Sequence, residues 1–176
     1  MINFPEYSES EKGNEILYTG RIPDDLYRKI QEYTVIVCHD VFIKTTIGKK
    51  SGILLVKRLV EPAKGEMWPV GGRILRGLNT EDSLRKKVQD ECNLTLSDME
   101  YLGAARTMFH GDIYGHGRGS DTLNLFYWAK SDGKIKLDSL HESPMIVTEA
   151  EYPMMRDSLA PYVRDCIDII LKRKLW

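Results

Sequence analysis

The sequence predicts an α/β fold in which helices pack on a mixed β-sheet. Runs of β-branched and aromatic residues predict several strands, and segments with apolar residues at helical spacing predict two or three helices. Stretches rich in glycine, proline and polar residues separate these segments and predict turns and loops. Because strands and helices are mixed along one chain of 176 residues, the pattern favours an α/β sandwich in a single domain.

The first half of the chain begins with a predicted helix. Pro23 and the acidic pair Asp24-Asp25 are typical of a helix start, and Tyr27 and Ile30 follow at helical spacing. The elements expected next are a strand at 34–43, a turn at 48–52, a strand at 53–56, and a loop over 60–72 that contains a short strand at 67–68.

Residues 79–92 form the clearest helix of the sequence. Asn79 or Thr80 can cap its start, and the acidic residues that follow suit the positive end of the helix dipole. Asn93 follows the helix at a position where a left-handed residue is expected, which asparagine tolerates well. The apolar stripe of this helix consists of Leu84, Val88 and Cys92.

The second half continues with strands and ends in an amphipathic helix. A loop rich in glycine and histidine, residues 110–121, lies between the strands expected at 99–109 and 123–130. The expected elements are strands at 99–109 and 123–130, a short strand at 134–137 in a polar loop, a brief strand at 146–147, a helical turn at 148–151, and a helix at 159–174.

The composition excludes several classes of partner. The formal net charge of -1 and the isoelectric point near 6.4 give no overall basic field, so we expect neither nucleic acid nor a membrane surface as a partner. The longest apolar run is far shorter than the roughly 18 residues of a membrane span. Any phosphate binding must therefore depend on a local cluster of cations.

The cysteines and the N-terminal residues predict a cytoplasmic protein. Cys38, Cys92 and Cys166 are far apart and odd in number, which favours reduced thiols over a disulfide framework. The first fifteen residues lack the apolar stretch of a signal peptide. Residues 1–20 are expected to form an arm, either flexible or docked on a partner chain, before one domain over 21–176.

The segment most informative about chemistry joins a glycine-rich loop to the helix over 79–92. Gly71-Gly72-Arg73 precedes the helix, and Lys87, Asp90 and Glu91 lie on one side of it, away from the apolar stripe. Carboxylates beside free backbone carbonyls form a hard-oxygen site that suits Mg²⁺, and Mg²⁺ can in turn hold a diphosphate.

This segment resembles the Nudix box, G-x5-E-x7-R-E-U-x-E-E-x-G-U, where U is apolar. With Gly72 on the first glycine, Leu78 lies at the first glutamate, and Lys86-Lys87 lie at the Arg-Glu pair. Asp90-Glu91 then match the Glu-Glu pair, and Asn93-Leu94 match the closing Gly and apolar residue. The resemblance implies a Nudix-type α/β/α sandwich with a mixed sheet and a loop-helix-loop motif.

Other stretches resemble one branch of that superfamily, the GDP-mannose mannosyl hydrolases, in which the box is itself altered. They occur in the same order and spacing over most of residues 22–165. They are IPDDLYRKIQEYT before the first strand, LLVKRLVEPAKGEMWPVGGR leading into the box, FHGDIYGHGRGSD before a strong strand, and LDSLHESPMIVTEAEY.

The resemblance implies hydrolysis of a GDP-sugar, GDP-mannose or GDP-glucose, to GDP and free sugar by attack of water at the anomeric carbon. Cations near the departing diphosphate lower the barrier, and a histidine is the natural base for the water. The resemblance also implies a homodimer. The residue roles it implies are His141 as base, Arg58, Arg73 and Lys86 toward the diphosphate, Asp40 orienting the nucleotide or an arginine, and Glu91 with the carbonyl of Gly71 binding Mg²⁺.

Leu140 departs from the branch pattern, and Lys87 departs from the general family box. Leu140 replaces an expected metal-ligating amide, so that water or Asp90 is the predicted substitute ligand. Lys87 lies where most family members have a metal-binding carboxylate, and we hypothesise that it replaces part of the positive charge that a second metal would have supplied.

Several alternatives stay open from the sequence. Asp90 and Glu91 could form a solvated helix face paired with Lys86 and Lys87. His110 and His116 are rival bases or sugar contacts. The alternative functions are a Nudix pyrophosphohydrolase that attacks phosphorus, and a catalytically silent module that binds a nucleotide sugar.

Overall fold

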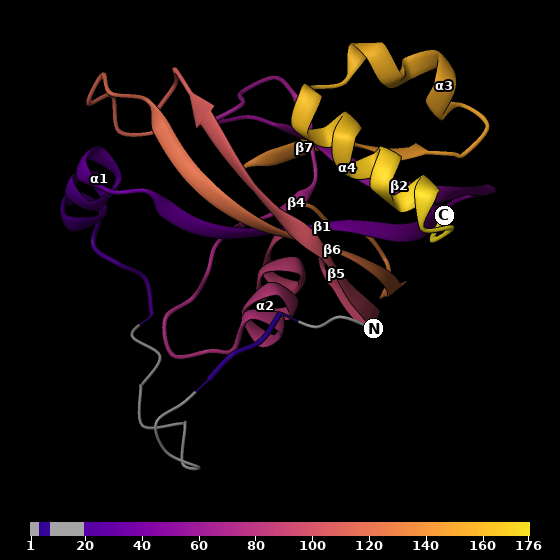
Figure 1. Cartoon of the computed structure of the whole chain (residues 1–176), viewed down its shortest axis with the longest axis horizontal. Helices are drawn as coiled ribbons and strands as arrows, with labels where there is room; N and C mark the ends of the chain where they lie inside the picture. The colour runs from indigo at the N-terminus through magenta and orange to yellow at the C-terminus, as the bar shows by residue number, and fades with distance from the viewer. Residues whose placement is uncertain (1–3, 8–19) are drawn as a thin grey trace.

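The fold is an α/β/α sandwich around one mixed sheet of seven strands, as the sequence predicted (Figure 1). The computed structural model describes residues 4–7 and 20–176. Within this part of the chain the elements are α1 (Asp24–Tyr33), β1 (Ile36–Ile47), β2 (Lys50–Arg58), β3 (Met67–Trp68), β4 (Val70–Arg73), α2 (Thr80–Cys92), β5 (Leu94–Phe109), β6 (Ser120–Gly133), β7 (His141–Val147), α3 (Tyr152–Met155), the 3-10 helix η1 (Arg156–Ser158) and α4 (Pro161–Lys172).

The sheet is mixed because β1 and β6 run parallel, whereas the other pairs are antiparallel. The main strand order is β3-β2-β1-β6-β5. Strand β1 pairs with β2 over its second half and with β4 over its first half, and β7 adds to the far side of β2. The first half of β1 therefore receives β4, the strand that precedes α2.

Each face of the sheet is covered by helices. Side chains alternate along the strands, so Val41 and Ile43 of β1 lie in the core under α2, whereas Phe42 lies in the core under α4. Leu84 and Val88 of α2 are fully buried in the first core. Figure 1 shows α2 on one side of the sheet, and α3 and α4 on the other.

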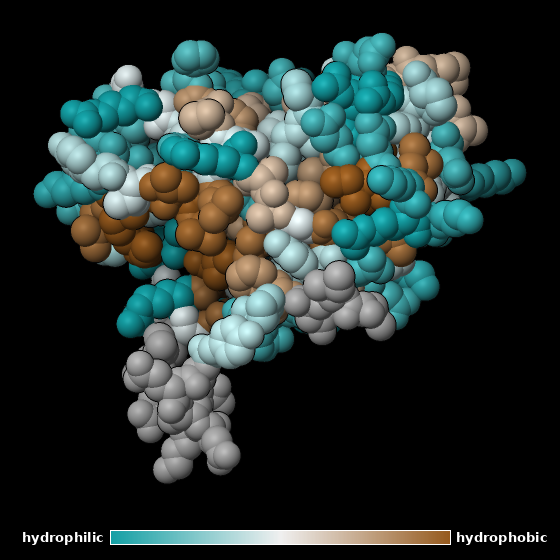
Figure 2. Space-filling model, viewed as in Figure 1, coloured by the Kyte–Doolittle hydropathy of each residue, from teal (hydrophilic) through white to brown (hydrophobic). Residues whose placement is uncertain are grey.

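The start of the β1–β6 pair is only partly covered. Val37 of β1 and Leu123 of β6 are partners in the register, and both side chains are exposed. Figure 2 shows apolar residues at the surface beside α1. None of the helices among residues 4–7 and 20–176 is long and apolar enough to cross a membrane.

The local signals for α2 are confirmed. The Asn79 side chain accepts a hydrogen bond of 2.8 Å from the backbone N–H of Asp82, which caps the helix start. Asn93 ends the helix with a φ of 56°, in the left-handed region. Part of the expected N-terminal arm also contacts this helix, because the Glu6 carboxylate accepts hydrogen bonds from the backbone and hydroxyl of Thr80. The rest of that arm, residues 1–3 and 8–19, lies outside the described residues.

Two sequence predictions about local structure were wrong. Residues 134–137 form no strand, because the backbone N–H groups of Lys136 and Asp138 donate to the carbonyls of Cys92 and Glu91, at 3.1 and 2.9 Å. These bonds satisfy carbonyls that the end of α2 leaves unpaired. The glycines predicted as part of a loop instead form β4 against β1, since pairing with a distant strand overrides their weak strand propensity.

We expect Leu84→Ala to lower the free energy of unfolding by about 2–5 kcal/mol, because it leaves a cavity between α2 and the sheet. Urea denaturation of both proteins measures this difference. Gln89→Ala, at an exposed position of the same helix, should stay within about 0.5 kcal/mol of the parent. Equal losses for the two variants would contradict this packing.

Candidate active site

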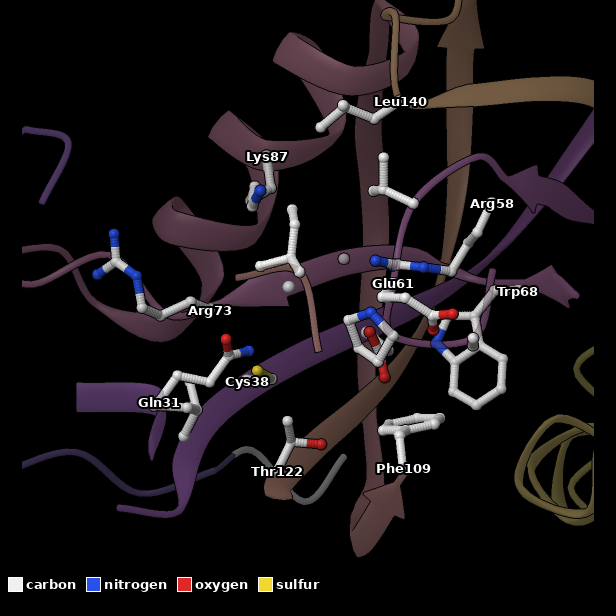
Figure 3. A pocket seen from close by; sticks show the side chains of 18 of the residues that line it. Gln31, Cys38, Arg58, Glu61, Trp68, Arg73, Lys87, Phe109, Thr122 and Leu140 are labelled. Atoms are coloured by element: carbon white, nitrogen blue, oxygen red, sulfur yellow. The ribbon is translucent and has the colours of Figure 1, made fainter. Parts of the chain in front are cut away.

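A cavity of about 350 Å³ lies where β1, β4 and α2 meet (Figure 3). Cys38 and Asp40 of β1 form part of its lining with the two glycines of β4, and Lys87 and Glu91 reach it from α2. The aromatic lining comes from Tyr27, Trp68, Phe109 and Tyr114. Figure 3 shows Arg73 and Arg58 on opposite sides of the space, with Lys87 between them on the helix side.

The two glycines of β4 allow α2 and β1 to approach closely. A Cβ on Gly71 would overlap the carbonyl oxygen of His39 and the carboxylate of Asp40. Gly72 has a φ of 144°, which disfavours other residues, and a Cβ there would lie 3.2 Å from Cε of Lys87. Any side chain at either position would therefore disturb the cavity wall.

Lys87 and Glu91 form an ion pair that faces the cavity. The Lys87 ammonium lies 2.6 Å from Oε1 of Glu91, one helical turn away. The side chains are 27% and 9% exposed, so this pair is far better shielded from water than a typical surface pair. Oε2 of Glu91 is buried and has no hydrogen-bond partner among the described residues.

Two arginines add positive charge to the cavity. Arg58 ends β2 opposite His141 of β7, and its Nε is buried without a hydrogen-bond partner in the described part of the chain. The Arg73 guanidinium lies over the ring of Tyr27, 5.3 Å from its centroid. Tyr27 thus links α1 to the cation at the end of β4.

His141 lines the same cavity and is held by a carboxylate. Its Nδ1 lies 2.8 Å from Oδ1 of Asp138, an atom that also accepts the backbone N–H of Leu140. Because Asp138 engages Nδ1, Nε2 is the ring nitrogen available to a bound molecule. The bonds from residues 136 and 138 to the end of α2 place this pair beside Glu91.

Asp40 is a buried carboxyl group next to Gly71. The hydroxyl of Tyr162 donates to its Oδ2 at 2.8 Å, a contact from α4 on the opposite face of the sheet. Burial raises the pKa of Asp40 from 3.8 to about 7, although Tyr162 and Arg58 oppose the shift. Asp40 therefore changes charge near neutral pH.

Not every predicted residue reaches the cavity. Lys86 and Asp90 pair with each other at 3.0 Å on an outward side of α2, and their side chains are 43% and 55% exposed. Neither lines the cavity, because one residue on a helix turns a side chain by about 100° relative to Lys87 and Glu91. His110 is exposed, and His116 is buried beside Asp112, so these rival bases also lie outside the lining.

The sequence interpretation assigned no site role to much of the lining. Glu61, Trp68 and Phe109 surround Arg58 at one end, and Gln31 lies at the other (Figure 3). Tyr27 also lines the cavity. Glu61 comes just before a cis peptide bond to Pro62. In the sequence, the Glu-Pro dipeptide and the tryptophan close to the glycine pair were the only local features that indicated the end of the cavity around Arg58.

The donors present do not fit a Mg²⁺ ion. Magnesium requires octahedral oxygen ligands at short distance, and the one α2 carboxylate in the cavity is already paired with Lys87. Among the described residues, no group of three or more His, Cys, Asp or Glu side chains is placed to hold a metal. Leu140 lines the cavity beside His141 without a donor group. Binding of Mg²⁺ by Glu91 and Gly71 therefore remains a prediction, and the ion pair between Lys87 and Glu91 argues against it.

The fold of the chain is that of the Nudix proteins. It matches the MutT protein of Methanosarcina mazei with a TM-score of 0.60 at 15% identity, over 80% of this chain and 95% of that one. It matches the NUDIX domain of Shewanella oneidensis NrtR, in complex with ADP ribose, with a TM-score of 0.60 at 16% identity, over 86% and 99%. A NUDIX hydrolase from Nitrosomonas europaea gives 0.61 at 14% identity, over 80% and 91%.

One curated protein is similar in sequence. The low-salt glycan biosynthesis protein Agl8 of Haloferax volcanii is 27% identical over 153 residues, which cover 86% of this chain and 92% of Agl8. No protein-family model matches the sequence.

We expect Asp40→Asn to change how stability depends on pH. Between pH 4 and 7 the folded protein holds a proton on Asp40 that the unfolded chain has lost, so this group makes the free energy of unfolding fall as pH rises. The stability of the parent relative to Asp40→Asn should therefore decline up to about pH 7 and then level off. Urea unfolding at several pH values measures it.

Comparing the parent with Asp40→Asn also removes the contribution of His39, which changes the stability with pH in the opposite direction to Asp40. Burial lowers the pKa of His39 to about 4, so His39 makes stability rise with pH up to its unfolded value of 6.5. His39 is present in both proteins and cancels in the difference. A difference that is independent of pH would show that Asp40 has an ordinary pKa.

Proposed function

We propose that this protein hydrolyses a nucleoside diphosphate sugar to the nucleoside diphosphate and free sugar. The observation that carries the proposal is that one cavity contains a histidine held by a carboxylate, His141 with Asp138, together with Arg58 and Arg73. A base and a cationic site for a diphosphate are the two groups that such a reaction requires.

In the proposed reaction His141 is the general base. Water attacks the anomeric carbon, its proton passes to Nε2 of His141, and the bond from that carbon to the diphosphate oxygen breaks. The electron pair leaves with the diphosphate. Asp138 would hold the ring in the orientation that presents Nε2 and would stabilise the imidazolium that forms.

The arginines would bind the diphosphate and stabilise its growing charge. Arg58 and Arg73 approach from opposite sides of the cavity, and a guanidinium suits the geometry of a phosphate. Asp40 would orient Arg58, whose charge already acts on it. The proposal gives no role to Lys86 and Asp90, which pair outside the cavity.

The comparisons support a nucleotide sugar as the substrate class. The NrtR domain with the same fold binds ADP ribose, a nucleoside diphosphate joined to a sugar. Agl8 is named for glycan biosynthesis, a process that consumes activated sugars. With the sequence resemblance, this makes GDP-mannose and GDP-glucose the first substrates to test. The homodimer and the cytoplasmic location remain predictions.

A labelling experiment distinguishes this reaction from its alternatives. After incubation with GDP-mannose in ¹⁸O-labelled water, we expect the label in mannose, because water attacks carbon. Mass spectrometry of both products locates it. Label in phosphate would assign a pyrophosphohydrolase, and saturable GDP-mannose binding without products would assign a silent binding module.

We expect His141→Gln to lower kcat by about 10²–10⁴, because it removes the base but keeps a polar side chain of similar size. The dissociation constant of GDP-mannose should change little, since the arginines remain. Steady-state kinetics and calorimetric titration measure the two quantities. His110→Gln, at an exposed position outside the cavity, is the matched control and should keep the parent rate. Full activity in His141→Gln would exclude this choice of base.

A further inference from the structure

The Lys87 ammonium faces Gly72 of β4. A Cβ built on Gly72 would lie 3.4 Å from Nζ of Lys87, so the amine lies next to the space that a side chain at Gly72 would enter. On its other side the amine is 2.6 Å from Glu91. The ammonium therefore lies between Gly72 and the Glu91 carboxylate. Glu91 and the carbonyl of the adjacent Gly71 are the two donors expected to hold a magnesium ion.

The ammonium also has hydrogen-bonding capacity left for a ligand. A lysine ammonium carries three N–H donors, and the Glu91 bond uses one of them. Lys87, Arg58 and Arg73 all line the cavity, together with the carboxylates of Glu61 and Glu91. Three cations that converge on one space suit the two negatively charged phosphates of a nucleoside diphosphate sugar.

We infer that Lys87 replaces the divalent cation of this fold, so that the protein binds the diphosphate of its ligand without a metal. The inference rests on the proposed function for the nature of the ligand, and on the contacts of Lys87 for its mechanism. Unlike a dissociable ion, a cation on the chain is present at any metal concentration. It supplies charge and hydrogen bonds to the diphosphate, whereas His141 activates the water.

The first test uses the unaltered protein with GDP and with inorganic pyrophosphate as probes. Calorimetric titration in excess chelator and in excess Mg²⁺ should give dissociation constants that agree within about threefold. Binding of GDP that weakens by more than this on chelation would overturn the inference. Failure of GDP to bind under both conditions would overturn it as well.

The second test removes the ammonium. Lys87→Met should weaken GDP binding by about tenfold to a hundredfold in chelator, because a charge-assisted contact to phosphate is lost. Removing the lysine also exposes Glu91, whose Oε2 already has no partner among the described residues, to cations. We therefore expect Mg²⁺ to restore part of the affinity in Lys87→Met, and more of it in Lys87→Glu.

Lys130→Met is the matched control, because Lys130 forms a 2.8 Å ion pair with Asp98 outside the cavity. It should bind GDP like the parent under both conditions. Electron paramagnetic resonance of Mn²⁺ provides a readout without nucleotide, with tight binding expected in Lys87→Glu and not in the parent. A tight Mn²⁺ site in the parent that Glu91→Gln abolishes would contradict the inference.

These outcomes separate the two proposals. Metal-independent GDP binding without hydrolysis of GDP-mannose would support the role of Lys87 and reject the proposed reaction. Hydrolysis of GDP-mannose that stops on chelation, with GDP binding lost in parallel, would support the reaction and reject the role of Lys87.

Discussion

The site depends on how the C-terminal turn of α2 is held. The carbonyls of Glu91 and Cys92 accept backbone N–H groups from residues 138 and 136, and Asn93 closes the helix in the left-handed conformation. Glu91 thus contributes its side chain to the cavity and its carbonyl to the segment that carries Asp138. Because Asp138 orients His141, one helix end positions both the charged pair and the histidine.

The cavity wall formed by β4 depends on backbone geometry rather than on side chains. Gly71 and Gly72 pair with β1, and Gly72 also faces Lys87, so neither has room for a Cβ without displacing a neighbour. Their pairing with β1 places Asp40 and the β4 backbone against the same space. A low-dielectric wall of this kind strengthens the interactions of nearby charges, and it also raises the pKa of Asp40.

The sequence predicted the parts of this structure that are determined locally. Asn79, the apolar stripe and Asn93 define α2 through contacts within a few residues, so the helix could be assigned without knowledge of its partners. Strand β4 and residues 134–137 depend on pairing with distant elements, and they were misassigned. Asp90 and Glu91 are adjacent in α2, so their side chains leave the helix in different directions. The spacing of the motif alone did not show which of the two faces the cavity. Trp68 and Glu61 reach the cavity only through the tertiary fold.

The role inferred for Lys87 is consistent with attack at carbon. A buried carboxylate such as Glu91 requires a compensating cation, which either solution or the chain can supply. A divalent ion can also activate water for attack on phosphorus, whereas an ammonium donates hydrogen bonds but cannot act as a Lewis acid. A site with an ammonium at this position therefore needs a separate base for the water, and His141, which lines the cavity and is held by Asp138, is suited to that task. The lysine at position 87 thus weakens the case for a metal ion and strengthens the case for a reaction at the sugar in which a histidine is the base.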